Sequence, residues 1–224
     1  RGLGDVYKRQ VIFPGSNCDK DVYNAILEVT GKKSKFIWYL DDFPSGLDLI
    51  IIPGGFSFGD YLRSGSIASK TKALKKIITA ASKGVSIIGI CNGFQILTEA
   101  SLLPGTLLVN SNLKFICKYV DLEVTNNKTR FSKSFDSKEI IRLPIAHKMG
   151  NYQINKNDLK VLEYENRILF KYVVGKEYSG NPNGSVENIA GIINEKGNIC
   201  GMMPHPERAF GSFQENTVLK NILD

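Results

Sequence analysis

The feature of this sequence that most restricts its fold is an almost wholly apolar run, residues 85–90, which leads directly into Cys91. A strand that is apolar on both faces is typical of the centre of a parallel sheet covered by helices on either side. Beyond the cysteine, Phe94 and Leu97 are spaced as on one face of a helix. The segment therefore predicts a central strand that turns sharply into a helix.

The residues before this run repeat the same alternation of strand, turn and helix. Strands are predicted at residues 11–13, 36–38 and 47–52. Asn17 or Asp19 is placed to cap a first helix, which Gly31 ends. A second helix is predicted over residues 66–81, with a buried stripe of Ile67, Leu74, Ile78 and Ala81. Right-handed crossovers between such units give a doubly wound, mostly parallel α/β sheet flanked by helices.

The pattern changes after Leu102, where short strands are separated by polar turns without long helices between them. Strands are predicted at residues 107–109, 119–124 and 168–173. This half predicts a mixed or antiparallel C-terminal extension that returns residues 204–207 to the sheet. We expect a single domain over residues 11–224. Residues 1–10 are polar and unlike the rest, and we interpret them as disordered or non-native.

Composition narrows the class of protein further. With 42% hydrophobic residues, the chain resembles ordinary globular proteins. It has no apolar run of the about 18 residues that a membrane span needs and no signal-peptide pattern, so a cytoplasmic location is expected. The four cysteines lack C-x-x-C spacing, which favours free thiols over a zinc site or a disulfide framework. The net charge of +7 comes with interspersed lysines and no aromatic–basic motif, so nucleic-acid binding is not favoured.

Cys91 is the candidate nucleophile. Gly89 and Gly93 stand two residues to either side of it, which gives the G-x-nucleophile-x-G pattern of an elbow with cysteine in place of serine. A turn this sharp forces the nucleophile into a strained backbone conformation that needs small neighbours. It also places the sulfur over a helix N-terminus, whose dipole favours a thiolate. The alternative, a buried structural cysteine after a core strand, stays open on this pattern alone.

A cysteine nucleophile needs a base, and the chain contains two histidines. His205 lies between two prolines, and Glu207 is close enough in sequence to orient its imidazole as the third member of a triad. His147 has no such neighbour and is interpreted as structural. No metal is expected, because the usual paired ligand spacing is absent from the remaining candidate set of His147, His205, Cys91 and Cys200.

A pair of glycines follows the strand predicted at residues 47–52. Paired glycines at the carboxyl end of a strand can turn backbone N–H groups toward a ligand. The N–H of Gly55 and the N–H of Asn92, directly after the nucleophile, are therefore candidate donors of an oxyanion hole. A plain turn is the alternative interpretation of this loop.

Six segments resemble class I glutamine amidotransferases, and more closely the glutaminase subunits of phosphoribosylformylglycinamidine synthases. They span the chain from about Val11 onward and are residues 13–19, 53–63, 89–95, 110–115, 181–185 and 202–209. The elbow and the His-Pro-Glu segment are shared by related amidotransferases. The extended glycine loop, the Asn-Ser-Asn segment and the Asn-Pro-Asn-Gly-Ser segment point to this family in particular.

The resemblance implies a reaction and a role for each candidate. Cys91 attacks the side-chain amide of glutamine, and His205, oriented by Glu207, protonates the departing ammonia. Gly55 and Asn92 supply the oxyanion N–H groups. Water then hydrolyses the glutamyl thioester with the histidine as base.

The resemblance also implies substrate contacts and partners. Gln95 and the loop at Asn110 are expected to hold glutamine. A larger synthetase subunit is expected to use ATP and magnesium to convert formylglycinamide ribonucleotide to the formylglycinamidine, together with a small accessory subunit. This chain has no G-x-x-x-x-G-K-[ST] loop, and no cofactor is expected in it.

Two stretches depart from the family pattern. Lys148 and Met149 follow Ile-Ala-His where the family has glycine and glutamate, and residues 1–10 replace a longer apolar lead-in to the first strand. Two other functions stay open at this point. One is a stand-alone Cys-His-Glu hydrolase of γ-glutamyl amides or peptides, and the other is a non-catalytic binding subunit that keeps the fold.

Overall fold

The computed structural model describes residues 8–209, 219, 220, 222 and 223. In this part of the chain the strands are β1 (Lys8–Ile12), β2 (Lys35–Trp38), β3 (Leu49–Ile52), β4 (Ser86–Ile90), β5 (Thr106–Leu108), β6 (Ile116–Val124), β7 (Ile140–His147), β8 (Asn151–Gln153), β9 (Ile168–Tyr172), β10 (Ile189–Ile193) and β11 (Ile199–Met202). The α-helices are α1 (Asp19–Thr30), α2 (Lys72–Ser82), α3 (Asn92–Glu99) and α4 (Lys156–Tyr164). None of these helices is long and apolar enough to cross a membrane.

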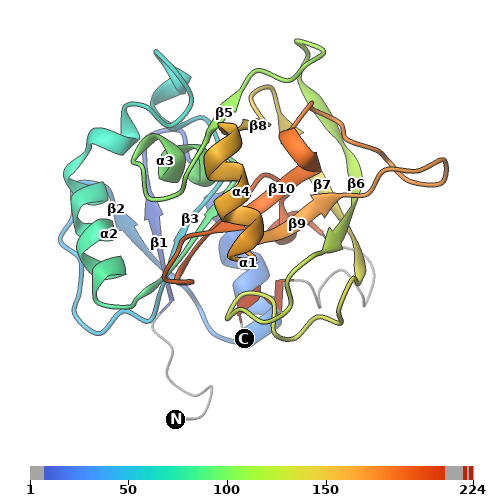
Figure 1. The fold of residues 1–224 in the computed structure, drawn as a ribbon. Coiled ribbons are helices and arrows are strands. Elements are labelled where there is room, and N and C mark those ends of the chain that lie inside the picture. The colour runs from blue at the N-terminus through green and yellow to red at the C-terminus, as the bar shows by residue number, and fades with distance from the viewer. Residues whose placement is uncertain (1–7, 210–218, 221, 224) are drawn as a thin grey trace.

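Nine of the strands form one sheet in the order β2-β1-β3-β4-β11-β10-β9-β6-β7, and β5 and β8 form a small second sheet. The first five strands of the large sheet pair in parallel. From β11 to β7 every pair is antiparallel. The predicted doubly wound α/β sheet with a mixed extension is therefore confirmed, and the extension continues the parallel half without a break (Figure 1).

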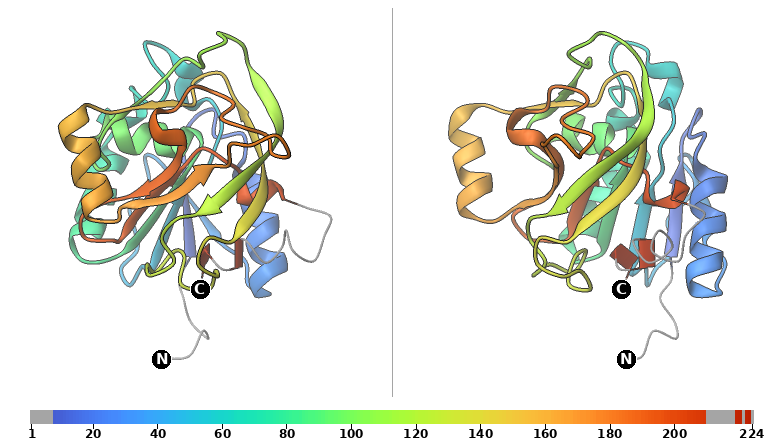
Figure 2. Two further views of the ribbon diagram at one scale, coloured as in Figure 1. Left: turned by 45° about the vertical axis from the view of Figure 1, so that its right-hand side comes forward. Right: turned by 90° about the vertical axis from the view of Figure 1, so that its right-hand side faces the viewer.

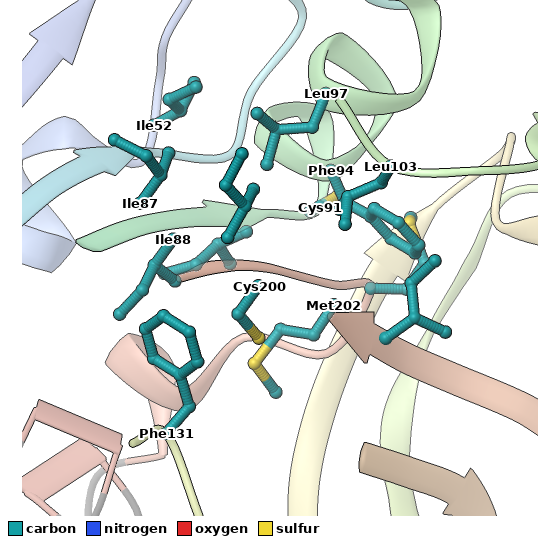
Figure 3. Packing of buried hydrophobic residues seen from close by; sticks show 14 of the residues in the cluster. Ile52, Ile87, Ile88, Cys91, Phe94, Leu97, Leu103, Phe131, Cys200 and Met202 are labelled. Atoms are coloured by element: carbon teal, nitrogen blue, oxygen red, sulfur yellow. The ribbon is translucent and has the colours of Figure 1, made fainter. Parts of the chain in front are cut away.

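The middle of the sheet is formed by β4 and β11. Every residue of β4 after Ser86 is buried, as are all residues of β11. Figure 3 shows Ile87 and Ile88 on opposite faces of β4, with Leu97 of α3 on the side of Ile87. Because side chains alternate along a strand, cover on both faces produces a continuously apolar run.

Helices cover both faces of this sheet. In the right-hand view of Figure 2, α1 lies on one side of the sheet and α4 on the other. Helix α3 packs against β3, β4 and β11. Because β1, β3, β4 and β11 run in the same direction, the loops that follow them meet at one edge of the sheet, where ligands bind in folds of this class.

Two boundaries near the N-terminus differ from expectation. Strand β1 begins at Lys8 and pairs with β2 and β3, so residues 8–10 belong to the sheet and are not disordered. Residues 1–7 lie outside the described part of the chain. Helix α1 follows Cys18, whose side chain makes no capping hydrogen bond, and ends at Gly31 in the left-handed conformation.

The second predicted helix is interrupted. A single 3-10 turn at Ala68–Lys70 precedes α2. Thr71 separates the two, because its backbone is extended and its side chain caps α2 by accepting a backbone N–H from the first turn. Ile77 is fully buried, whereas Ile78 is 41% exposed, so the predicted stripe was wrong at that position. Spacing alone allows either isoleucine to face the sheet, and packing decides between them.

Helix α4 was not predicted. Asn155 caps it, with a side-chain oxygen that accepts the N–H groups of Asn157 and Asp158. Leu162 is the only buried residue of this helix. With so narrow an apolar stripe, the periodicity that reveals a helix in sequence is weak.

Candidate active site

Cys91 lies at the turn from β4 into α3, as the elbow pattern predicts. Its φ and ψ angles are 50° and −104°, a conformation that residues with a side chain rarely adopt. Its N–H donates to the carbonyl of Met202 at 2.8 Å, and its carbonyl accepts the N–H of Gln95 at 3.1 Å. Both β11 and α3 therefore hold this residue in a strained geometry, which is typical of functional positions.

The glycines that flank Cys91 are required by close backbone contacts. A Cβ atom on Gly93 would overlap the carbonyl oxygen of Ile52, at the end of β3. A Cβ atom on Gly89 would lie 2.6 Å from the backbone of Gly93. The elbow therefore brings the N-terminus of α3 close against both β3 and β4.

The glycine loop after β3 lies beside the elbow. Gly55 has a φ of 142°, and the N–H of Phe56 donates to the carbonyl of Gly15 at 2.8 Å, so the loops after β1 and β3 support each other. The side chain of Asn92 accepts the N–H of Ser57 at 3.0 Å and so joins the elbow to this loop. As the first residue of α3, Asn92 also has an N–H without an acceptor inside the helix. The oxyanion role of Gly55 and Asn92 stays a prediction that this arrangement supports.

The loop after β11 brings His205 and Glu207 to the same edge. Nδ1 of His205 lies 2.6 Å from Oε1 of Glu207, and both side chains are fully buried. A Cβ atom on Gly54 would lie 2.7 Å from Cε1 of His205 and 3.4 Å from Cβ of Cys91, so both side chains lie against this glycine. Nε2 of His205 has no partner among the described residues. The structure thus brings the three predicted catalytic residues together.

The charge on His205 is controlled by its neighbours. Burial acts to lower the pKa of His205, but the negative charges of Glu207 and Cys91 raise it well above its ordinary value. The protonated imidazole is thereby favoured, and it can donate a proton to a leaving amine.

A pocket with a volume of about 230 Å³ opens onto Cys91. The carbonyl oxygen of Ala146, at one wall, lies 3.8 Å from Sγ of Cys91. The described residues that line it are Gly55, Phe56, Asp60, Ser64, Cys91, Gln95, Phe115, Ala146, His147, Lys148 and Met149. A larger cavity of about 530 Å³ lies elsewhere and contains no member of the triad. The smaller pocket is therefore the candidate substrate site.

Comparison with known families agrees with this geometry. Residues 11–222 match the family of CobB/CobQ-like glutamine amidotransferase domains. The chain belongs to this family. The resemblance drawn from the sequence segments is thereby confirmed.

Solved structures resemble this amidotransferase to different degrees. A chain of the structure described as PurLQS from Thermotoga maritima is 46% identical, with a TM-score of 0.84 and coverage of 96% of both chains. A glutamine amidotransferase from Thermotoga maritima is 17% identical, with a TM-score of 0.53 and coverage of 90% of this chain and 76% of that chain. The second similarity concerns the fold alone.

Gln95 of the amidotransferase lines the pocket, but its amide group already has protein partners. Its Nε2 donates to the carbonyl of Met149 at 2.6 Å, and its Oε1 accepts from the side chain of Asn92 at 2.8 Å. The side chain therefore ties the elbow to the opposite wall of the pocket. The predicted contact of Gln95 with substrate stays a prediction.

Asn110 is fully buried and is not among the residues that line the pocket. Its Nδ2 donates to the carbonyl of His147 at 3.0 Å, and its Oδ1 accepts the N–H of Gly150 at 3.0 Å. Asn183 and Ser185 donate to the carbonyl of Gly150 at 2.8 and 3.2 Å. The Asn-Ser-Asn and Asn-Pro-Asn-Gly-Ser segments therefore support the pocket wall at residues 147–150 from behind.

Lys148 and Met149, which depart from the family pattern, lie on this wall. Backbone carbonyls of these two residues accept the hydrogen bonds from Asn110 and Gln95: the N–H of Asn110 donates to the carbonyl of Lys148, and Gln95 donates to the carbonyl of Met149. Because the backbone carbonyl of any residue can accept these hydrogen bonds, lysine and methionine at positions 148 and 149 preserve them.

We expect Asn110→Ala to weaken glutamine binding indirectly. The variant leaves the buried carbonyl of His147 and the N–H of Gly150 without this partner, which should lower the free energy of unfolding by about 2–3 kcal/mol. KM for glutamine should rise several-fold with a smaller change in kcat. Denaturant unfolding and steady-state kinetics test this, with the exposed Asn157→Ala as control. A collapse of kcat at unchanged stability would instead indicate direct contact with the reacting groups.

His147, interpreted from the sequence as structural, is buried and also lines the pocket. Its Nδ1 donates to Oδ1 of Asn110 at 3.1 Å. Burial, together with the charge of His205, lowers the pKa of His147 to about 4, so it is neutral at physiological pH. This wall of the pocket therefore carries no imidazolium charge.

Cys18, for which the sequence predicted no role, lies beside His205. A Cβ atom on Gly54 would meet Sγ of Cys18 at 3.1 Å. Ligand atoms of Cys18, His205 and Glu207 lie within 4.8 Å of one another. The hydrogen bond between His205 and Glu207 already uses the atoms that face each other, which fits a triad better than a metal site. The only sequence signal was the position of Cys18 inside the family-like segment 13–19.

Proposed function

We propose that this chain is the glutaminase subunit of a phosphoribosylformylglycinamidine synthase. It hydrolyses glutamine to glutamate and ammonia, and a synthetase subunit uses the ammonia and ATP to convert formylglycinamide ribonucleotide to formylglycinamidine ribonucleotide. The observation that carries the proposal is that Cys91, which lines a pocket, and His205, which is hydrogen-bonded to Glu207, both lie against Gly54. The 46% identity to the PurLQS chain over 96% of both chains supports the biosynthetic setting.

The geometry supports a thioester mechanism. The sulfur of Cys91 forms a bond to the side-chain carbonyl carbon of glutamine, and the carbonyl oxygen becomes an oxyanion between the N–H groups of Gly55 and Asn92. The carbon–nitrogen bond then breaks as His205 gives its proton to the departing ammonia. The same histidine removes a proton from water, which attacks the thioester carbon. The carbon–sulfur bond then breaks, the proton returns from the histidine to the sulfur of Cys91, and glutamate is released. Glu207 keeps the imidazole oriented and stabilises its charge.

The partners follow from this reaction. The ATP-dependent step requires a second protein, and we propose a large synthetase subunit that holds ATP and magnesium, with a small accessory subunit beside it. This chain needs no cofactor for amide hydrolysis by a thiol. We also propose a cytoplasmic location, where a reactive thiol stays reduced.

Reconstitution with the synthetase tests the proposal. The synthetase alone should aminate formylglycinamide ribonucleotide with ammonium and ATP but not with glutamine. Adding this chain should make glutamine a substrate, and glutaminase turnover should rise at least about 10-fold over that of the isolated chain. The accessory subunit is added in a third arm. Fast glutamine hydrolysis by the isolated chain, without any transfer to the synthetase, would contradict the proposal and favour a stand-alone hydrolase.

A further inference from the structure

Among the described residues that line the pocket at Cys91, Asp60 is the one acidic residue. Its side chain is partly buried, and burial raises the pKa of this carboxyl, against a smaller opposite effect of a hydrogen bond from Ser64. Nδ2 of Asn92 lies 3.4 Å from its Oδ1. The carboxylate therefore lies at the candidate substrate site with two uncharged hydrogen-bond partners, Ser64 and Asn92.

No ion pair among the described residues includes Asp60. Taking a carboxylate partly out of water without a cation costs free energy, and a positive group in the pocket would recover it. The same lining contains one lysine, Lys148, while His147 is neutral. One negative and one positive side chain at a small pocket complement a zwitterion.

The backbone around Asp60 is held in an unusual conformation. Asp60, Phe58 and Leu62 have φ angles of 54°, 52° and 69°, in the left-handed region that residues with side chains seldom occupy. The N–H of Phe58 donates to the carbonyl of Pro14 at 2.7 Å, which fixes this loop to the loop after β1. Several strained residues in succession indicate a segment whose geometry is maintained for a specific placement.

We propose that Asp60 binds the α-ammonium group of glutamine and thereby selects the free amino acid over N-acylated or peptide-bound glutamine. This inference rests on the proposed glutaminase function and adds the group that recognises the distal end of the substrate. With the side-chain amide at Cys91, the α-carbon of glutamine extends along the pocket away from the sulfur. The volume of about 230 Å³ lies below the about 300 Å³ at which pockets for drug-sized ligands begin, which fits a single amino acid.

Asp60→Asn tests the proposal, because it keeps the shape and removes the charge. We expect KM for glutamine to rise about 10-fold or more, with kcat changed less than about 3-fold, since the α-ammonium is far from the reacting carbon. Labelling of Cys91 by a diazoketone analogue of glutamine, which carries the α-ammonium, should slow by a similar factor. Labelling by iodoacetamide, which lacks that group, should keep the wild-type rate. Asp136→Asn, on an exposed loop, is the matched control.

The wild-type protein gives a second measurement that does not depend on folding of the variant. It should hydrolyse N-acetylglutamine at least about 100-fold less efficiently than glutamine, measured as kcat/KM. Comparable turnover of the two substrates would overturn the proposal. An unchanged KM in Asp60→Asn would also overturn it, as would equal slowing of both labels, because Asp60 would then act on Cys91 itself. Failure of the glutaminase function would look different, since wild-type protein would neither hydrolyse glutamine nor react with the analogue.

Discussion

Cys91→Ala should lose glutaminase activity by at least about 10³-fold in kcat/KM, because no other described residue that lines the pocket has a thiol to form the thioester. The substitution removes one sulfur atom from a buried position and leaves the backbone turn in place. The folded protein should therefore persist, and ammonium-dependent amination by the synthetase complex should continue. The measurement is ammonia release from glutamine, together with the two amination assays on the same preparation.

Cys117→Ala provides the matched control for this variant. Cys117 is an exposed thiol on β6, so its loss should leave turnover at the wild-type rate. Undiminished hydrolysis in Cys91→Ala would reject the assigned nucleophile. Loss of activity in Cys117→Ala would show that turnover depends on a thiol outside the candidate site.

His205→Ala should cost about 10²- to 10⁴-fold in kcat, because it removes the imidazole that lies beside Cys91 and is hydrogen-bonded to Glu207. Glu207→Gln should cost less. A hydrogen bond to a charged partner contributes about 1.5–3 kcal/mol, which corresponds to about 10- to 150-fold in rate. Steady-state kinetics on the two variants give the comparison.

The pH dependence separates an orienting role of Glu207 from a purely structural one. The negative charge of Glu207 raises the pKa of His205, so removing that charge lowers this pKa. Activity that needs an imidazolium should therefore decline at a lower pH in Glu207→Gln than in the wild-type protein. Equal losses in the two variants, with unchanged pH profiles, would argue for a more direct role of the carboxylate.

The catalytic groups were accessible to sequence reasoning because their geometry is local. The strand, the nucleophile and the helix form one continuous segment, and backbone sterics demand glycine at Gly89 and Gly93. His205 and Glu207 are two residues apart, and the structure joins them by a hydrogen bond of 2.6 Å. The spacing of residues along the chain could therefore reveal the elbow at Cys91 and the pair of His205 and Glu207 separately, without knowledge of the fold that brings them together.

The substrate pocket could not be predicted in the same way. Its walls combine a loop after β3, the first turns of α3 and the end of β7, which are separated by long stretches of chain. Nothing near Asp60 in sequence shows that it lines the same pocket as Cys91. Asn110 was expected at the substrate but lies behind the pocket wall, because its hydrogen bond with Gly150 depends on the pairing of β5 with β8. Such placements arise from tertiary packing and carry no local periodicity.

The central position of β11 is a further non-local result. This strand lies beside β4 although more than a hundred residues separate them, and Cys91 donates its N–H to Met202 at the end of β11. In the chain, the other strands of the antiparallel half lie between β4 and β11, although β4 and β11 are neighbours in the sheet. The sequence predicts that residues 204–207 return to the sheet. It does not predict β11, the strand that leads to His205.

The most direct test of the account is the site of covalent labelling by the diazoketone analogue of glutamine. Intact-mass analysis followed by peptide mapping should find one adduct per chain, located on Cys91, and none in Cys91→Ala. Excess glutamine should protect the wild-type protein, because both compounds occupy the same pocket. An adduct on Cys18, Cys117 or Cys200, or labelling that survives in Cys91→Ala, would contradict the assignment of the nucleophile.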